Sequence, residues 1–530
     1  MASNTKELFR KKYIYYILFA CIALGIFVRF HNTDELIFYD DEIRAVLSSI
    51  KFHNEGWEQG IMYEREHPPL AKWIMGLPSK FIPADYEKLK LVGSNMYIWE
   101  QVAHDAIGAN HVAIRTVVGI FGVLFILMVF LVARYVFENN KIALWSVVIA
   151  ATSLNQIAFS RMAYKQVILG TFMLAAVYFH LLYLNSKSKN KYWYWVPLFF
   201  FVIMTLGTRA QLPILILPVL IINQFIFKFR KKAITENIIF SALSVVCYFL
   251  VFRWIYPVEI QEIAAAKNSL RQVGSIFGII DIYNFPHVVK AFFLTNSYLF
   301  ALGSALLIYY IYTLFRDKKI HKKEAYLFIW FIIFFGVFSL TFVGWKIRYL
   351  QVLFFPMILL MGKPIYKYLK NNYVLFVVLI ALAATVVTIF TAYPYYHEYA
   401  NFGVDEKQDS RDHGTLGRVE SYKPLSYSPT GEYDVVFDDL RERGNPKIFT
   451  EILNFLVFYE GESISLPHPY EGICNPVDMD KIPKDDYYFL ENHGERDFGM
   501  YFCPYFFMNN TFTLVKEYNL KGMTLYKINS

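Results

Sequence analysis

Long apolar stretches recur through the first three quarters of the chain and are separated by short polar connectors. Clear examples are Val112 to Phe137 and Glu236 to Tyr256. A helix needs about 20 apolar residues to cross a bilayer, and about 11 stretches come near that length. The pattern therefore predicts a mainly α-helical, polytopic membrane protein. The expected spans begin near Tyr13, Val112, Lys141, Gln166, Tyr192, Ala210, Glu236, Ala291, Glu324, Ile347 and Tyr373.

The charges of the connectors alternate along the chain. Every second connector is short and basic, as in Lys228 to Lys232, whereas the intervening ones, such as Gly344 to Arg348, carry fewer charges. Cytoplasmic loops are enriched in Lys and Arg. We therefore expect an integral membrane protein with its N-terminus in the cytoplasm and its C-terminal tail on the extracytoplasmic side.

The pattern changes after the last apolar stretch. Tyr433 to Arg443 fits a helix that Gly444 ends, and a hairpin is expected at Asn519 to Gly522. Strands are predicted for Lys447-Ile-Phe-Thr, Ser463-Ile-Ser-Leu, Asp486-Tyr-Tyr-Phe-Leu and Thr511-Phe-Thr-Leu-Val. Two domains follow: a transmembrane domain at residues 1–392, whose large first outer loop covers residues 31–111, and a small extracytoplasmic α/β domain at residues 393–530.

Composition supports this assignment. Of 530 residues, 56% are hydrophobic and 18% are charged, against about 25% charged in ordinary soluble domains. A disordered chain, collagen and a disulfide scaffold are excluded. The long apolar blocks also argue against a single soluble enzyme.

The net charge of +8 is unevenly divided. From Tyr393 onward there are 23 acidic and 13 basic residues, a charge of −10, so the remainder carries +18. This split suggests basic cytoplasmic loops and an acidic outer domain, with no nucleic-acid partner. Cys474 and Cys503 both lie in the tail, and the sequence leaves open whether they form a disulfide.

The first outer loop holds the candidate acids. Asp40, Asp41 and Glu42 follow the first span, and Glu66-His67 stands directly before a Pro-Pro pair. Paired carboxylates suit a site in which one accepts a proton from an acceptor hydroxyl and the other orients or binds a substrate. Two alternatives are a solvated acidic loop with a helix cap, and a site for a hard cation.

The candidate cations lie at outer ends of spans, at Ser160-Arg161-Met-Ala-Tyr-Lys165, Gly207-Thr-Arg209 and Trp345-Lys346-Ile-Arg348-Tyr349. Single cations there can simply extend to the interface. Several on one side can together clamp a phosphate. Acids and cations on the same side suggest that the cations hold the phosphate of a lipid-linked phosphosugar as the leaving group. A carboxylate would activate the acceptor for attack with inversion.

These residues resemble known motifs. Asp41-Glu42 resembles the first-loop motif of the membrane C-type glycosyltransferases, and Asp41-Glu42-Ile43-Arg44 is also similar to the lipid A aminoarabinose transferases. His67-Pro-Pro-Leu-Ala-Lys72 resembles a stretch of the protein O-mannosyltransferases. Ser160-Arg161-Met-Ala resembles the Ser-Arg-x-Ala of the same superfamily, and Lys346-x-Arg348-Tyr349 resembles its late-span signature.

The resemblance implies the GT-C fold and a metal-independent, inverting glycosyltransferase without a cofactor. Its donor would be a polyprenyl (dolichyl)-phosphate sugar in membrane lipid, and its acceptor a protein, glycan or lipid. Asp41 would be the base and Glu66 the second acid. Residues implied in substrate binding are Asp40, Glu42, Arg44, His67, Lys72, Arg161, Lys165, Arg209, Lys346, Arg348 and Tyr349.

Other functions remain alternatives. Mannosyltransferases usually have Asp where this chain has Gln166, so a protein acceptor is left open. A transporter or flippase of lipid-linked sugars is the rival, although transporters place polar sites at mid-bilayer on broken helices. The Trp-Trp-Asp-Tyr-Gly motif of oligosaccharyltransferases is absent from the sequence, as are Walker and dinucleotide-binding motifs.

Overall fold

The computed structural model describes residues 2–31, 33, 40–56, 69–83, 109–209, 213–228, 234–250, 298–317, 320–340, 347–369, 434–450, 463–465, 487–492, 511–518 and 523–529. The chain divides into two compact units. The first contains Met1–Thr33, Arg65–Ile74 and Arg115–Leu425. The second contains Asp34–Glu64, Met75–Ile114 and Ser426–Ser530.

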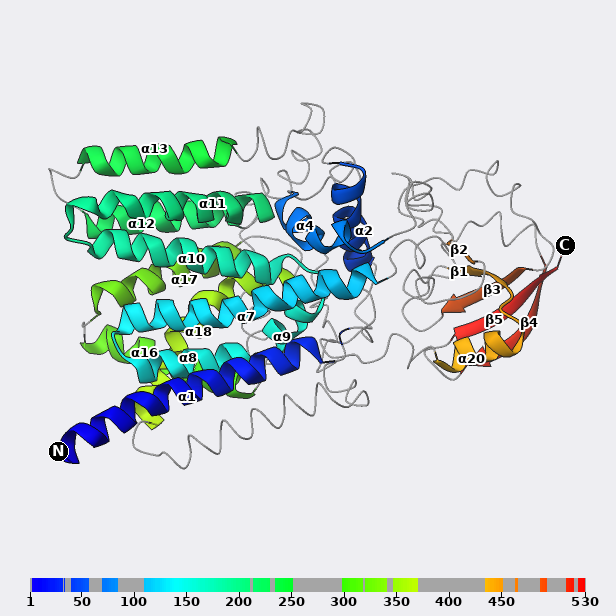
Figure 1. The fold of residues 1–530 in the computed structure, drawn as a ribbon, viewed down its shortest axis with the longest axis horizontal. Helices are drawn as coiled ribbons and strands as arrows, with labels where there is room; N and C mark the ends of the chain where they lie inside the picture. Colours follow the sequence, from blue (N-terminus) through cyan, green and yellow to red (C-terminus); the bar gives the residue numbers. More distant parts are fainter. Residues whose placement is uncertain are drawn as a thin grey trace. The chain divides into compact units, whose positions relative to one another are not determined.

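The first unit is a bundle of helices that lie side by side with their axes roughly parallel (Figure 1). The short helix α4 covers Leu70–Met75, and the 3-10 turns η2 and η3 cover Lys189–Tyr194 and Pro213–Leu215. The longer helices are α1 (Ala2–Phe30), α7 (Asn110–Phe137), α8 (Asn140–Thr152), α9 (Leu154–Arg161), α10 (Gln166–Asn185), α11 (Trp195–Thr208), α12 (Ile216–Phe227), α13 (Ile234–Leu250), α16 (Tyr298–Asp317), α17 (Lys322–Leu340) and α18 (Ile347–Leu369).

Helices occur near ten of the predicted span starts, and the eleventh start, Tyr373, lies outside the described residues. By length and composition α7 and α10 can each cross a membrane. The stretch expected as one span from Lys141 is bent by 57° between α8 and α9, because Ser153 between them is extended. If α8 and α9 together form one broken span, they add a third to α7 and α10. The total of about 11 spans stays a prediction.

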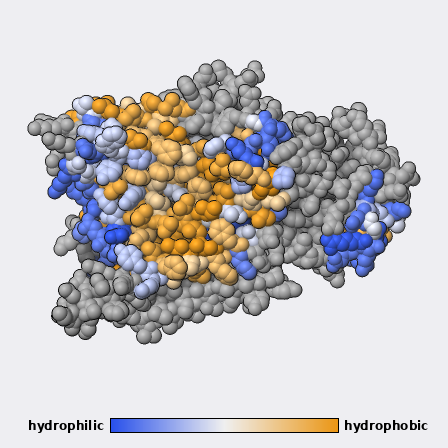
Figure 2. All heavy atoms as spheres, in the orientation of Figure 1, coloured by the Kyte–Doolittle hydropathy of each residue, from blue (hydrophilic) through white to orange (hydrophobic). Residues whose placement is uncertain are grey.

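The surface of the bundle agrees with an apolar surrounding. Figure 2 shows hydrophobic residues over the middle of the helices and hydrophilic residues gathered at one edge. Large apolar side chains such as Phe200, Ile308 and Ile332 are more than half exposed. A fold that leaves such side chains on its outside is typical of helices that face lipid.

Small residues let the helices approach closely. A Cβ atom on Gly362 of α18 would lie 2.7 Å from the carbonyl oxygen of Ile142 in α8. A Cβ on Gly170 of α10 would lie 2.5 Å from the ring of Phe355 in α18. Close backbone approach at glycine is characteristic of membrane helix pairs, so α18 is packed tightly against both α8 and α10.

The second unit contains α2 (Asp40–Asn54), η1 (Leu77–Lys80), α20 (Asp434–Glu442) and a five-stranded mixed sheet. The strands are β1 (Lys447–Thr450), β2 (Ser463–Ser465), β3 (Tyr487–Asn492), β4 (Thr511–Tyr518) and β5 (Met523–Asn529), in the order β2-β1-β3-β5-β4. β1 pairs in parallel with β2 and β3, whereas β5 runs antiparallel to β3 and β4.

These elements lie where the sequence predicts them. Gly444, at a φ of 79°, follows α20 as expected of a helix-ending glycine. Tyr518 pairs with Met523 across the predicted hairpin, although its turn lies outside the described residues. Cys474 and Cys503 also lie outside them. The boundary at residue 393 and the outer location of this domain stay predictions.

Candidate functional site

The acidic motif opens a helix. α2 begins at Asp40, so Asp40, Asp41 and Glu42 occupy its first turn, where the positive end of the helix dipole favours carboxylates. Glu42 is fully buried, so the interpretation as a solvated acidic loop does not hold for this residue. The side chains of Asp40, Asp41 and Arg44 are not among those the structure describes, and their roles stay predictions.

The second predicted motif is described in part. Glu66 and His67 lie outside the described residues, whereas Lys72 on α4 is buried. A Cβ on Gly207, near the end of α11, would lie 3.1 Å from Leu70 of α4. The beginning of α4 therefore packs against the end of α11, which Arg209 follows directly. This contact brings the helix that carries Lys72 against the helix that Arg209 follows.

Three further predicted cations are buried at helix ends. Arg161 ends α9, Lys165 precedes α10 and Arg209 follows α11. Their relative exposures are 0%, 8% and 2%, so none of them extends into water, as the alternative of interfacial cations would require. Lys346 lies outside the described part of the chain. Arg348 and Tyr349 lie in the first turn of α18, and their side chains are not described.

Arg161 has defined partners. Its Nη1 donates to the carbonyl oxygen of Val28 at 3.3 Å and its Nη2 to that of His31 at 2.7 Å. Arg115 of α7 donates to the carbonyl oxygen of Thr33 at 2.7 Å. Arg29 of α1 donates to the carbonyl oxygen of Ala150 in α8 at 3.4 Å.

Two of these buried cations escaped the sequence analysis. Arg29 and Arg115 stand inside apolar stretches, and both are buried. The available signal was the charge itself, because an ionisable residue within a membrane span is rare and marks a polar or functional location. Arg29 also donates to the carbonyl of Gly25 in its own helix at 3.1 Å. The partners Ala150 and Thr33 lie 121 and 82 residues from their arginines, so the sequence alone does not identify them.

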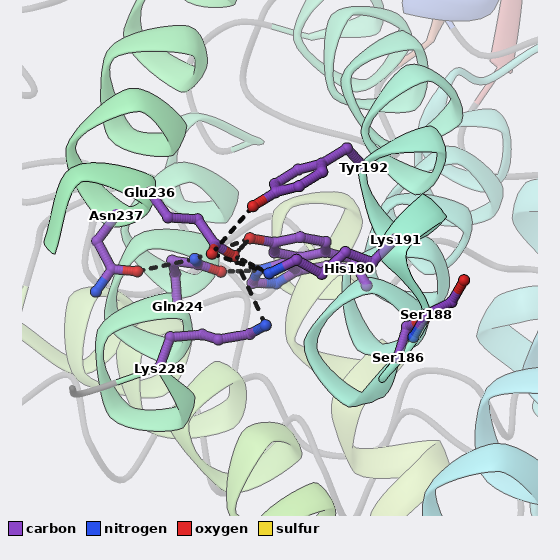
Figure 3. Close-up of polar contacts among 10 residues, drawn as sticks. His180, Ser186, Ser188, Lys191, Tyr192, Gln224, Lys228, Glu236 and Asn237 are labelled. Atoms are coloured by element: carbon purple, nitrogen blue, oxygen red, sulfur yellow. Dashed lines mark hydrogen bonds and ion pairs between the residues drawn. The ribbon is translucent and has the colours of Figure 1, made fainter. Parts of the chain in front are cut away.

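A second polar cluster lies at the opposite end of α10 (Figure 3). Glu236 of α13 accepts hydrogen bonds from Tyr183, from Lys191 at 2.9 and 3.0 Å, and from Tyr192 at 3.4 Å. Lys228, after α12, forms an ion pair with Glu236 at 3.6 Å. This carboxylate thus joins the ends of three helices and two basic connectors.

Beneath Glu236 the cluster continues through neutral groups. His180 faces Tyr326 Oη at 2.9 Å and Gln224 Oε1 at 3.3 Å. Gln224 donates to Asn237 Oδ1 at 2.9 Å. These side chains are buried, and hydrogen bonding offsets the cost of burying their polar groups. The network connects α10, α12, α13 and α17, and sequence analysis did not predict it.

A metal site is not visible in the described part of the chain. There, no three side chains of His, Cys, Asp or Glu gather as a metal ion requires. Glu66 and His67 are outside that part, so the hard-cation alternative of the sequence analysis is not tested.

Known proteins provide the next line of evidence. Residues 95–256 match the family described as dolichyl-phosphate-mannose-protein mannosyltransferase. None of the curated protein sequences matches the chain. Solved structures show extensive likeness in fold.

ArnT from Cupriavidus metallidurans in the apo state matches with a TM-score of 0.57 at 12% identity, over 98% of both chains. The same protein bound to undecaprenyl phosphate matches with a TM-score of 0.55 at 11% identity, over 97% of this chain and 98% of that one. The archaeal oligosaccharyltransferase AglB from Archaeoglobus fulgidus, in complex with an inhibitory peptide and a dolichol-phosphate, has a TM-score of 0.51 at 14% identity. That match covers 91% of this chain and 70% of AglB.

The family match covers residues 95–256, less than a third of the chain. Over nearly the whole chain, the fold is similar to that of ArnT.

Proposed function

We propose that this protein transfers a sugar from a polyprenyl-phosphate donor to an acceptor hydroxyl on the extracytoplasmic side of the membrane. The observation that carries the proposal is the group of buried cations Lys72, Lys165 and Arg209, in a chain that matches a mannosyltransferase family over residues 95–256. Burying cations is costly, and a phosphate is a ligand that they match in charge and geometry.

The donor assignment has support from the relatives. ArnT and AglB have been solved with undecaprenyl phosphate and dolichol-phosphate respectively. A donor of this kind would hold its lipid tail in the bilayer and its phosphate near the start of α10 and the end of α11, where Lys165 and Arg209 lie. The transferred sugar is a hexose or a pentose, and the acceptor is a protein, a glycan or a lipid.

The proposed reaction is a single displacement. The carboxylate of Asp41 takes the proton of the acceptor hydroxyl, and the acceptor oxygen attacks the anomeric carbon from the face opposite the phosphate. The bond between that carbon and the phosphate oxygen breaks, its electron pair stays on polyprenyl phosphate, and the configuration inverts. Arg209, Lys165, Lys72 and Arg348 stabilise the charge that develops on the leaving phosphate.

Other residues of the motifs are proposed to bind substrates. Glu66 is the second acid, which binds donor or acceptor, and His67 stands beside it in the sequence. Asp40, Glu42 and Arg44 surround the base along α2. Lys346 and Tyr349 stand beside Arg348 in the sequence, and Arg348 and Tyr349 lie in the first turn of α18.

The test uses the purified full-length chain in lipid with a panel of radiolabelled polyprenyl-phosphate hexoses and pentoses. The proposal expects that one donor is consumed and that its label appears on an acceptor with inverted anomeric configuration. Movement of intact donor across sealed vesicles without release of polyprenyl phosphate would instead identify a transporter. Consumption of no donor in the panel, with membrane acceptors supplied, would contradict the proposal.

A further inference from the structure

The end of α1 is held by two arginines from other helices. The last four carbonyl groups of a helix have no partner within it. The N–H of His31 donates a hydrogen bond to the carbonyl oxygen of Phe27 at 3.0 Å. Arg161 donates to the next carbonyl oxygen along the helix, that of Val28. Beyond the helix, Arg161 also binds the carbonyl of His31, and Arg115 binds that of Thr33.

Charge favours this arrangement. The C-terminal end of a helix carries a partial negative charge, so a cation placed there is stabilising, and more so when it is partly buried. The arrangement is also reciprocal. Arg29, in the last turn of α1, donates from Nη1 to the carbonyl of Gly25 in its own helix and from Nη2 to the carbonyl of Ala150 in the last turn of α8. α1 and the bent pair therefore cap each other.

Packing leaves this junction little freedom. A Cβ on Gly122 of α7 would lie 2.6 Å from Ser160 Cβ and 2.8 Å from Arg29 Cδ. A Cβ on Gly119 would lie 2.7 Å from the ring of Phe30. α7 thus presses against the ends of both α1 and α9, and glycine is the residue that permits this closeness.

We propose that Arg115 and Arg161 are positioning residues for catalysis. They fix the chain where it leaves α1, seven residues before Asp40 at the start of α2. At present the last held residue, Thr33, precedes Asp40 by seven residues. If the chain were released from Val28 onward, the distance along the sequence from Val28 to Asp40 would be twelve residues. A misplacement of about 1 Å can cost about 100-fold in rate. The catalytic part of this role rests on the proposed function, in which Asp41 is the base.

The experiment compares variants of the full-length protein in lipid nanodiscs. Arg115→Met and Arg161→Met remove the carbonyl contacts. Arg134→Met is the matched control, because Arg134 is an exposed arginine in the last turn of the same α7. Arg115→Lys keeps a donor and a charge for the Thr33 carbonyl, and it also serves if a methionine variant fails to fold.

Two readouts are taken from each variant. Hydrogen–deuterium exchange of the peptide that covers the end of α1 is expected to rise about tenfold or more in both methionine variants and to stay unchanged in Arg134→Met. For sugar transfer, kcat is expected to fall about 10- to 100-fold, with KM for the donor within about twofold. Arg115→Lys should recover most of the lost kcat.

The outcomes separate the two claims. Unchanged hydrogen–deuterium exchange in both methionine variants overturns the claim that the arginines hold the end of α1, whatever the rate of sugar transfer. A raised KM with unchanged kcat overturns the positioning role, since that pattern indicates donor binding. A wild-type chain that transfers no sugar overturns the proposed function and the catalytic role with it. The exchange data then still decide whether the arginines hold the end of α1.

Discussion

The carboxylate of Glu236 is the charge on which the cluster in Figure 3 depends. Its side chain is 15% exposed, and that of its partner Lys191 is 18% exposed. The substitution Glu236→Gln keeps the size of the side chain but removes its charge. An amide offers one oxygen where the carboxylate offers two, so contacts with Lys191, Tyr183 and Tyr192 are weakened together.

The expected cost follows from these contacts. Breaking a buried ion pair by removing one partner costs about 3–5 kcal/mol, and hydrogen bonds to charged groups contribute about 1.5–3 kcal/mol. Partial exposure to water and the amide's remaining hydrogen bonds reduce this to about 2–4 kcal/mol. With an unfolding entropy of about 2.1 cal/mol/K per residue, summed over the first unit, this free-energy loss should lower the Tm by about 3–5 °C.

The assay is thermal unfolding of the purified protein in detergent, with Glu138→Gln as the matched control. Glu138 also forms an ion pair with a lysine, Lys323, at 2.5 Å, but its side chain is 73% exposed. Exposed ion pairs contribute little, so this control should keep the wild-type Tm. Equal Tm values for both variants would refute the claim that Glu236 stabilises the bundle.

Two further predictions concern packing and pH. Gly362→Ala should destabilise the bundle by about 1–3 kcal/mol, because the added Cβ would press on α8. The control Gly336→Ala should be neutral or stabilising, since a Cβ there has no atom within 4 Å. A lowered Tm for both variants would contradict this prediction. Burial opposes ionisation of Asp439, but hydrogen bonds from Arg443, Lys516 and Tyr518 outweigh it and hold the pKa of that carboxyl below its usual value of 3.8. Stability from this group is therefore present above about pH 4 and lost as pH falls further. Pepsin cleavage of the segment from α20 to β5, measured at each pH relative to an unstructured reference peptide, should become faster below that pH, and Asp439→Asn should remove this rise; the same relative profile in both proteins would refute the assignment.

Local patterns predicted the tail well. The strands from Lys447, Ser463 and Thr511 are short segments rich in β-forming residues between turn signals, and Gly444 is a typical helix-ending glycine. Such signals act over a few residues, so they can be read without knowledge of the tertiary structure. The pairing order of the strands, with β3 between β1 and β5, is a non-local property that the patterns did not contain.

The candidate site was predicted less completely, for physical reasons. The ends of apolar stretches drew attention to Arg161 and Arg209, and the structure buries both at helix ends, while their role in substrate binding stays a prediction. The sequence did not show that Arg161 binds the carbonyls at the end of α1, since that contact crosses more than 100 residues. Nor did it show that α2 starts at Asp40, because charged residues in a long loop carry little periodic signal.

The central claim is that the carboxylate of Asp41 removes the acceptor proton in transfer from a polyprenyl-phosphate sugar. The most direct measurement is single-turnover transfer of radiolabelled sugar by Asp41→Asn, beside Asp40→Asn and the wild-type chain, with donor binding measured on the same samples. General-base catalysis is worth about 100- to 10,000-fold in rate, so we expect Asp41→Asn to lose transfer by that factor while it binds donor as the wild type does. Transfer by Asp41→Asn at the wild-type rate would contradict the account.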